Sequence, residues 1–205
     1  EDGSIGWTYI DQSKYCKPLH DLVPLRNKLV KRTVLNTVES LIGPIKGVNT
    51  HSILGYVHKP YPPIYASLAD QAGFSSSLLI RGVEGGVVPS LRQKGMMVSY
   101  FKGEEKDRVD IDPKVIGINR ALRAISFPKE FEGLKNRNSL ATYVAELGQS
   151  ALSGKAGMFY DGLVYSASLI LWHIGAEKTL LAASERVRAA LDSSNALVRI
   201  EDKQN

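Results

Sequence analysis

The first half of the chain alternates short apolar runs with turn residues. Val48 to Val57 is rich in β-branched and apolar residues and ends before Lys59-Pro60-Tyr61-Pro62-Pro63, which predicts a strand followed by a turn. Residues 77–81 form a second apolar run that Gly82 stops, and residues 96–101 form a third. Runs of this length between turn residues are typical of buried strands. We therefore predict three strands in this region.

The last third of the chain shows helical spacing. Helices are predicted over residues 139–153, 160–174 and 177–192. In the last of them apolar residues recur at helical spacing from Leu180 to Leu191, which indicates a stripe that faces a core. A shorter helix over residues 64–71 is predicted after Pro63, because proline suits a first helical turn and Gly73 can end the helix.

Strands followed by helices favour an α/β fold. We expect residues 53–57 and 78–80 to be neighbouring, largely buried strands of one sheet, with the helix after Pro63 packed on a face of that sheet. The charged segment 102–112 predicts a solvated turn. Residues 200–205 are predicted to be a frayed end.

Composition is that of an ordinary soluble domain. The chain has 205 residues, of which 43% are hydrophobic and 23% charged, and these values favour one domain with one core. The most continuous apolar stretch, Leu163 to Gly175, is shorter than the roughly 20 residues that span a bilayer, so it predicts a buried helix and no membrane partner. No secretory signal is visible, and the single Cys16 cannot form an internal disulfide. A cytoplasmic location is the resulting expectation.

The net charge of +5 is unevenly distributed along the chain. Lys17 to Lys59 contains seven basic residues against two acidic ones, Asp21 and Glu39. Such a segment favours partners that carry phosphate, whether nucleotides, phosphosugars or nucleic acid. A solvated basic face without a ligand is the alternative.

Several stretches together resemble a known family. In chain order they are Val23-Pro24-Leu25-Arg26, Arg32-Thr33-Val34-Leu35-Asn36, Leu78-Leu79-Ile80-Arg81-Gly82-Val83-Glu84-Gly85, Asp161 to Ala167, and Ala189 to Ser193. In this order and spacing they are similar to the anthranilate phosphoribosyltransferase branch of glycosyltransferase family 3. The loop after Arg81, with the basic Leu91-Arg92-Gln93-Lys94 behind it, looks more like the divergent second type, whose members are associated with nucleic-acid binding.

The resemblance implies that residues 1–205 are the C-terminal part of the family's large α/β domain, with a central sheet flanked by helices. Family enzymes also have, upstream, a helical domain and a Gly-Thr-Gly-Gly-Asp loop that cradles the pyrophosphate of phosphoribosyl pyrophosphate, and no residues here match either. We therefore expect these residues alone to be inactive. Because family members usually dimerise through the helical domain, a homodimer is expected for the full-length protein.

Four residues are substrate-binding candidates by this resemblance: Arg26, Arg32, Arg81 and Glu84. Arg26 matches the arginine that pairs with the carboxylate of anthranilate, and a guanidinium offers a rigid bidentate fork for such a group. The alternative for Arg26 is a surface or capping arginine. Arg32 would support a phosphate or a neighbouring loop, or else form a structural salt bridge with an acid such as Glu39.

The loop from Gly82 to Pro89 departs from the family pattern. Where family enzymes have an Asp-Glu pair that holds magnesium, this chain has Val87 and Val88, and apolar side chains cannot supply the oxygen ligands that magnesium requires. A family histidine is replaced by Arg81. We predict no metal at this loop, with magnesium bound only if a missing N-terminal part supplies ligands. An anion-binding corner is one interpretation, and a tight loop that uses glycines for positive φ is the other.

Two functions from different classes remain. One is a phosphoribosyltransferase-like enzyme, a divergent one, in which Arg26 orients an aromatic acid. The other is a non-catalytic nucleic-acid-binding protein on the same fold, since Lys and Arg contacts to phosphate dominate such affinity. Its predicted contacts converge on one face at the strand ends: Lys28, Lys31, Arg32, Arg81, Arg92 and Lys94.

The remaining conspicuous residues have structural interpretations. Asp161 is predicted to be a cap or a first-turn acid, and Trp7 and Trp172 to be core residues. The four histidines are interpreted as structural or exposed rather than as metal ligands: His20, His51, His58 and His173.

Overall fold

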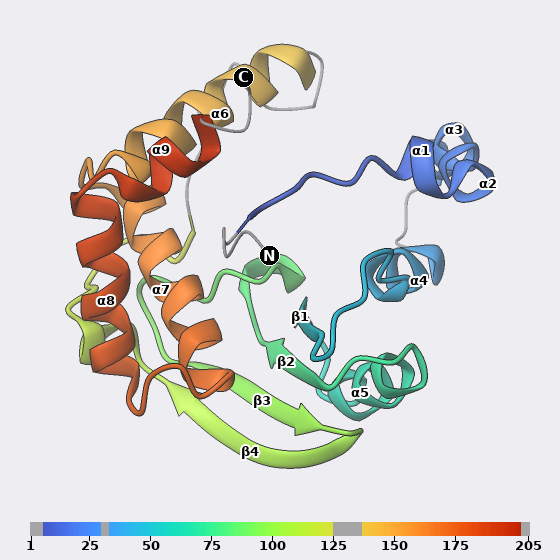
Figure 1. Ribbon diagram of the computed structural model, residues 1–205, viewed down its shortest axis with the longest axis horizontal. Coiled ribbons are helices and arrows are strands. Elements are labelled where there is room, and N and C mark those ends of the chain that lie inside the picture. Colours follow the sequence, from blue (N-terminus) through green and yellow to red (C-terminus); the bar gives the residue numbers. More distant parts are fainter. Residues whose placement is uncertain (1–5, 30–32, 125–136, 202–205) are drawn as a thin grey trace.

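A computed structural model describes residues 6–29, 33–124 and 137–201. It shows one mixed sheet with helices on both faces, and so confirms the predicted α/β class (Figure 1). The strands are β1 (His51–Gly55), β2 (Ser76–Ile80), β3 (Gly95–Phe101) and β4 (Glu104–Ile111). The helices before and between them are α1 (Gln12–Tyr15), α2 (Lys17–His20), α3 (Val23–Arg26), α4 (Leu35–Leu41) and α5 (Tyr61–Gln71). The helices after them are α6 (Arg137–Leu152), α7 (Met158–His173), α8 (Leu180–Asp192) and α9 (Asn195–Glu201).

The strands lie in the order β1-β2-β3-β4. The first two are parallel, with Ile53 opposite Leu78, and the remaining pairs are antiparallel. This arrangement confirms that the two predicted segments, 53–57 and 78–80, contribute neighbouring strands. The first of them ends at Gly55, two residues before the predicted end, and Val57 is 46% exposed rather than buried. The strand predicted from Val48 begins only at His51, and Val48 itself is 99% exposed.

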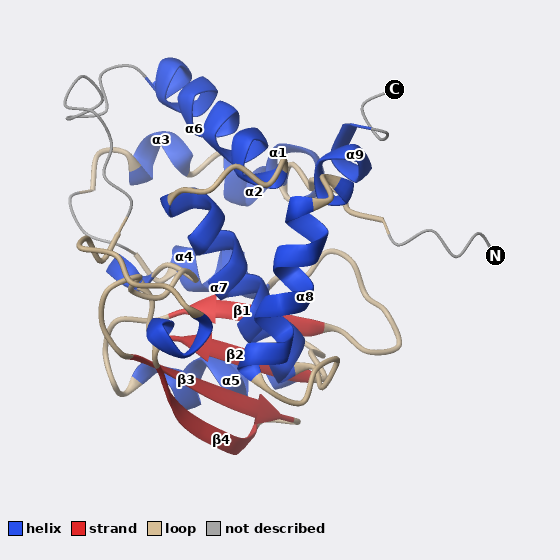
Figure 2. Ribbon diagram, turned by 90° about the vertical axis from the view of Figure 1, so that its left-hand side faces the viewer, coloured by secondary structure: helices blue, strands red, loops and turns tan. Residues whose placement is uncertain are grey.

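The sheet lies between two hydrophobic layers. Every residue of β2 is buried, and its side chains alternate between the faces, as a strand requires. Leu78 and Ile80 join a core with α7 and α8, whereas Leu79 joins a second core with Ala66 and Ala69 of α5. In Figure 2, α7 and α8 lie in front of the sheet and α5 lies behind it. The predicted packing of the helix after Pro63 on a face of the sheet is therefore confirmed.

The prediction of a solvated turn over residues 102–112 is wrong. Only Lys102 and Gly103 turn the chain, both with positive φ, as in the tight turns that connect antiparallel strands. The following Glu104–Ile111 is strand β4, which pairs with β3 and has one irregularity of register between Ser99 and Tyr100. As an edge strand, β4 exposes most of its side chains, and charge is a common feature of sheet edges.

Several element ends differ from the predicted ones for local reasons. Helix α5 begins at Tyr61, with Pro62 and Pro63 in its first turn, where a missing N–H costs no helical hydrogen bond. Helix α8 begins at Leu180 because the side chain of Thr179 caps it by accepting from the Ala182 N–H at 3.1 Å.

The chain ends also differ from expectation in part. Trp7 is not a core residue; it is 42% exposed and its Nε1 donates to the carbonyl oxygen of Arg199. The predicted frayed end begins inside α9, which continues to Glu201. Residues 202–205 lie outside the described part of the chain. Within the described part, no helix is long and apolar enough to cross a membrane.

Candidate functional site

A cleft of about 950 Å³ opens at the carboxyl end of β1. We call it the first cleft, and we call the loop from Gly82 to Pro89 that follows β2 the glycine loop. Strand β1, helix α4, the start of α5 and the glycine loop line the first cleft. Its lining combines aromatic and polar side chains, namely Tyr56, His58, Tyr61, Tyr65, Asn36, Thr37, Glu39 and Ser40. Open α/β sheets bind ligands outside the carboxyl ends of their strands, so its position is typical of a binding site.

The glycine loop approaches β1 too closely for side chains. A Cβ built on Gly55 would lie 2.2 Å from the carbonyl oxygen of Gly85, and one built on Gly82 would lie 1.8 Å from that of Gly86. Gly85 has a φ of +78°, which glycine adopts without strain. Glu84, beside it, has a φ of +55° although it is not glycine. The glycine loop is therefore held close to β1. Gly55 and Gly82 allow the close packing, and Gly85 allows the positive φ, so that the loop forms one wall of the first cleft.

Three aromatic rings stand in sequence along the α5 side of the first cleft. The ring centroids of His58 and Tyr61 are 5.9 Å apart, and those of Tyr61 and Tyr65 are 5.5 Å apart. The Thr37 hydroxyl donates to the Tyr65 hydroxyl at 3.4 Å, which links α4 to α5. Tyr56 lies deeper, and burial raises its pKa, so it is a neutral phenol at physiological pH. These rings, tilted against one another by 38° and 59°, form an aromatic wall with polar tips.

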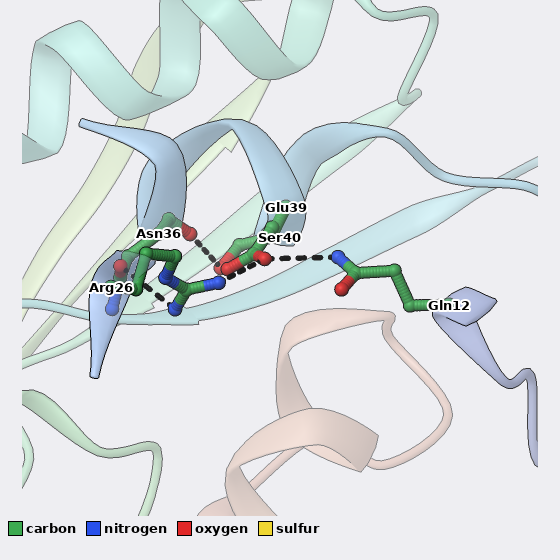
Figure 3. Close-up of polar contacts among 5 residues, drawn as sticks. All are labelled: Gln12, Arg26, Asn36, Glu39 and Ser40. Carbon is green, nitrogen blue, oxygen red and sulfur yellow. Dashed lines mark hydrogen bonds and ion pairs between the residues drawn. The ribbon is translucent and has the colours of Figure 1, made fainter. Parts of the chain in front are cut away.

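Arg26 is bound to partners within the chain, which Figure 3 shows. Its Nη1 forms an ion pair with the carboxylate of Glu39, and its Nη2 donates to Asn36 Oδ1 at 3.0 Å. Gln12 Nε2 donates to the same Glu39 oxygen at 3.0 Å. The side chains of Arg26 and Glu39 are 23% and 18% exposed, so the pair is largely shielded from water. Three helices, α1, α3 and α4, are thereby joined.

This network bears on the predicted salt bridge of Glu39, for which Arg32 was the expected partner. Glu39 does form a salt bridge, but its partner in the described residues is Arg26. Arg32 lies outside the described residues, as does Lys31. Glu39 lines the first cleft, whereas Arg26 does not. A ligand-binding role for Arg26 stays a prediction.

A second cleft, of about 760 Å³, lies at the far side of the glycine loop. Arg81, Lys94 and Arg123 line it together with Glu84 and Asp110. Lys94 is 3.8 Å from Asp112, and Arg123 is 3.5 Å from Glu84. Such long, exposed pairs contribute little, so these cations remain available to an anion.

The six predicted nucleic-acid contacts are only partly brought together. Arg81 and Lys94 line the second cleft, and Arg92 is exposed in the segment between them. Lys28 follows α3 and lines neither cleft. The convergence of all six residues therefore stays a prediction.

The residues of the glycine loop do not fit a magnesium ion. Val87 and Val88 lie in this loop, and their side chains offer no oxygen to a hard cation. Glu84 is exposed and paired with Arg123. Over the described ranges, no group of three or more His, Cys, Asp or Glu side chains could hold a metal ion.

A polar chain links strands β1, β2 and β3 on the α7 side of the sheet, and the sequence patterns did not predict it. Its members Ser76, Ser99 and His173 are buried, whereas His51 at its end is exposed. His173 Nε2 lies 2.8 Å from Ser76 Oγ, and its Nδ1 lies 3.0 Å from Ser99 Oγ. Ser76 Oγ also lies 2.7 Å from His51 Nδ1. Burial lowers the pKa of His173 to about 4, so the ring is neutral at physiological pH. Serines inside the apolar strands β2 and β3 were the signal of a buried polar partner, but the sequence does not show that His173 is that partner.

Asp161 occupies the first turn of α7, as predicted. It is buried, and its Oδ2 forms an ion pair with Arg120 Nε at 2.5 Å. The pair ties the start of α7 to the loop that follows β4. Its contacts are those of a structural residue.

A model of the glycosyl transferase family, a/b domain, matches residues 4–197. The chain belongs to this family. The match covers nearly the whole chain and confirms the resemblance that the sequence motifs indicated.

The relatives of this family member are mostly anthranilate phosphoribosyltransferases. That of Aeropyrum pernix is 26% identical over 190 residues, which are 92% of this chain and 51% of the relative. An uncharacterized protein of Aquifex aeolicus is 29% identical over 169 residues, which are 82% of this chain and 49% of the relative. The chain spans about half the length of the curated relatives it matches.

Solved structures share the fold. Anthranilate phosphoribosyltransferase from Saccharomyces cerevisiae in complex with 4-fluoroanthranilate has a TM-score of 0.73 at 20% identity, covering 95% of this chain and 53% of that one. The same yeast enzyme in complex with phosphoribosyl pyrophosphate and magnesium has a TM-score of 0.69 at 21% identity, covering 90% and 50%. At these identities the likeness is one of fold.

Proposed function

We propose that this chain forms the acceptor-binding part of a phosphoribosyltransferase-like protein. The observation that carries the proposal is the first cleft, which lies at the carboxyl end of a parallel strand and has an aromatic wall. Membership of the family supports it, as does the yeast enzyme of the same fold that binds a fluorinated anthranilate. An aromatic amine would stack against Tyr61 and Tyr65 while its polar groups meet Asn36, Thr37 and Glu39.

In the proposed protein, the glycine loop differs from the magnesium-binding loop of the family enzymes. Because Val87 and Val88 replace the acidic pair, residues 82–89 of the proposed protein do not hold magnesium. Calorimetric titration of the full-length protein with magnesium alone should show no binding at this loop. The double variant Val87→Asp/Val88→Glu should gain magnesium binding. Millimolar or tighter binding by the unchanged protein, lost on Glu84→Gln, would overturn this part of the proposal.

The cleft itself is tested with substitutions at Tyr65. Full-length protein is assayed with phosphoribosyl pyrophosphate and a series of aromatic amines, and both ligand affinity and pyrophosphate release are measured. Tyr65→Ala removes a ring from the cleft wall and should weaken acceptor binding by about tenfold, with the affinity for phosphoribosyl pyrophosphate unchanged. Tyr65→Phe keeps the ring and is the matched control. Acceptor affinity that is equal in all three proteins would contradict the proposal.

A second candidate, nucleic-acid binding without catalysis, is favoured by the second cleft. Arg81 makes no ion pair or side-chain hydrogen bond within the described residues, and Lys94 and Arg123 have only long pairs. If this surface binds nucleic acid, affinity should fall steeply as salt rises. Arg81→Ala with Arg92→Ala should lower both the affinity and the salt slope, whereas the exposed Lys155→Ala serves as control. Salt-insensitive or absent binding would exclude this candidate.

The homodimer expected from the resemblance also remains a proposal. Light scattering of the full-length protein should give twice the mass of one chain. A monomeric mass at micromolar concentration would contradict it.

A further inference from the structure

The polar side of the first cleft carries a carboxylate where the family resemblance leads one to expect a cation. Glu39 lines the cleft from α4, and no Lys or Arg of the described ranges lines it. The guanidinium of Arg26 does not line the cleft. It is held by Glu39 and by Asn36 Oδ1 (Figure 3). The arginine is therefore already paired with a carboxylate of its own chain.

The Arg26–Glu39 pair is costly to separate. Both side chains are at least three-quarters buried, and breaking a buried pair leaves an uncompensated charge. Gln12 holds Glu39 from the other side by donating to its Oε1 at 3.0 Å. A ligand carboxylate that reached for Arg26 would have to displace Glu39 or lie beside it, and two like charges at short range repel.

The acceptor capacity of Glu39 is not exhausted by these contacts. A carboxylate has about four acceptor positions, and the bonds from Arg26 and Gln12 both end on Oε1. The cleft thus presents hydrogen-bond acceptors near Glu39 and flat rings at Tyr61 and Tyr65. A planar ring that carries N–H donors and no negative charge matches both features.

We propose that the first cleft selects an uncharged aromatic amine or nitrogen heterocycle that donates N–H to Glu39, and that the Arg26–Glu39 pair rejects ring carboxylates. The inference rests on the proposed function, since it names the substrate class of that same site. Glu39 acts as the specificity-determining residue, and Arg26 is the positioning residue that orients its carboxylate.

The test uses two ligands that differ in one group. Anthranilate and 2-aminobenzamide share the ring and the amine, but the second has a neutral amide in place of the carboxylate. Calorimetry on the full-length protein should show 2-aminobenzamide binding about tenfold more tightly than anthranilate. This comparison needs no variant, so the inference can be overturned even if a variant fails to fold.

Variants then assign the selection to Glu39. Glu39→Gln keeps the shape, removes the charge and releases Arg26, so the preference for the amide should shrink by about tenfold or reverse. Glu104→Gln, on the exposed edge strand β4, is the matched control and should leave the ratio unchanged. Thermal melting confirms that each variant is folded.

The two proposals fail in different ways. Tighter binding of anthranilate by the unchanged protein, or an unchanged ratio in Glu39→Gln, overturns the inference and leaves the aromatic-acceptor function standing. Binding of neither ligand overturns both.

Discussion

Gly82 is the position in the glycine loop with least room. Its φ of −81° is open to any residue, so its need for glycine is purely steric: a Cβ would lie 1.8 Å from the Gly86 carbonyl oxygen and 3.0 Å from that of Val88. Both contacts are with backbone, which cannot rotate away as a side chain could. The loop would have to move as a whole.

Gly82→Ala should therefore lower the free energy of unfolding by at least about 2 kcal/mol. Gly148→Ala is the matched control, because Gly148 lies inside helix α6 and a Cβ there meets nothing within 4 Å. That change should be stabilising by about 0.5–1 kcal/mol, since alanine favours a helix interior. Urea unfolding of the three proteins measures both effects. A Gly82→Ala protein as stable as the parent would refute the close packing of this loop.

His173 gives the fold a pH dependence of known sign. Burial first, and then the charges of His51 and Lys106, lower its pKa to about 4 from an ordinary value of 6.5. The unfolded chain therefore binds a proton at a pH where the folded chain does not. The contribution to stability is fully present above pH 6.5 and is lost as pH falls toward 4, by on the order of 3 kcal/mol in total.

Thermal melting between pH 4 and pH 6.5 measures this loss. His173→Gln should flatten the pH dependence over this interval, because glutamine does not titrate and can still bond to Ser76 and Ser99. His20→Gln, at an exposed site, is the control and should keep the slope of the parent. An unaltered slope in His173→Gln would show that other groups cause the acid loss.

At the scale of elements, apolar periodicity was the reliable signal. The buried strand β2 and the helices α7 and α8 were predictable because each presents apolar residues at the spacing of its own geometry. Strand β4 was missed because its sequence from Glu104 to Asp110 is mostly charged, and only Ile111 is buried. Pairing with β3, a tertiary interaction, makes this segment a strand.

The candidate site was less predictable than the fold. The departure at Val87 and Val88 that the family pattern indicates stays a prediction. The Arg26–Glu39 pair could not be predicted from the sequence, because thirteen positions separate the two residues. Only a spacing of three or four positions within one helix would have predicted a contact. Likewise His173 meets Ser76 across 97 positions. Contacts between distant segments depend on how α1, α3 and α7 pack, which local patterns do not determine.

At the scale of the whole molecule, the sheet separates two cores and places two clefts at one end of its parallel strands. The first cleft has an aromatic wall and the carboxylate of Glu39, which is paired with Arg26. The second has Arg81 together with Lys94 and Arg123, whose acidic partners are 3.8 Å and 3.5 Å away. The glycine loop separates them. In the proposed function, the first cleft holds the acceptor, and the second cleft is the surface that the nucleic-acid alternative would use.

Hydrogen–deuterium exchange on the full-length protein tests the central claim, that the first cleft is the ligand site. With saturating phosphoribosyl pyrophosphate and 2-aminobenzamide, peptides that cover α4 and residues 55–65 should exchange more slowly than in the unliganded protein, while those over β4 should not change. Protection confined to residues 81–94 and to Arg123, with none over α4 or α5, would contradict the account and assign the ligand to the second cleft.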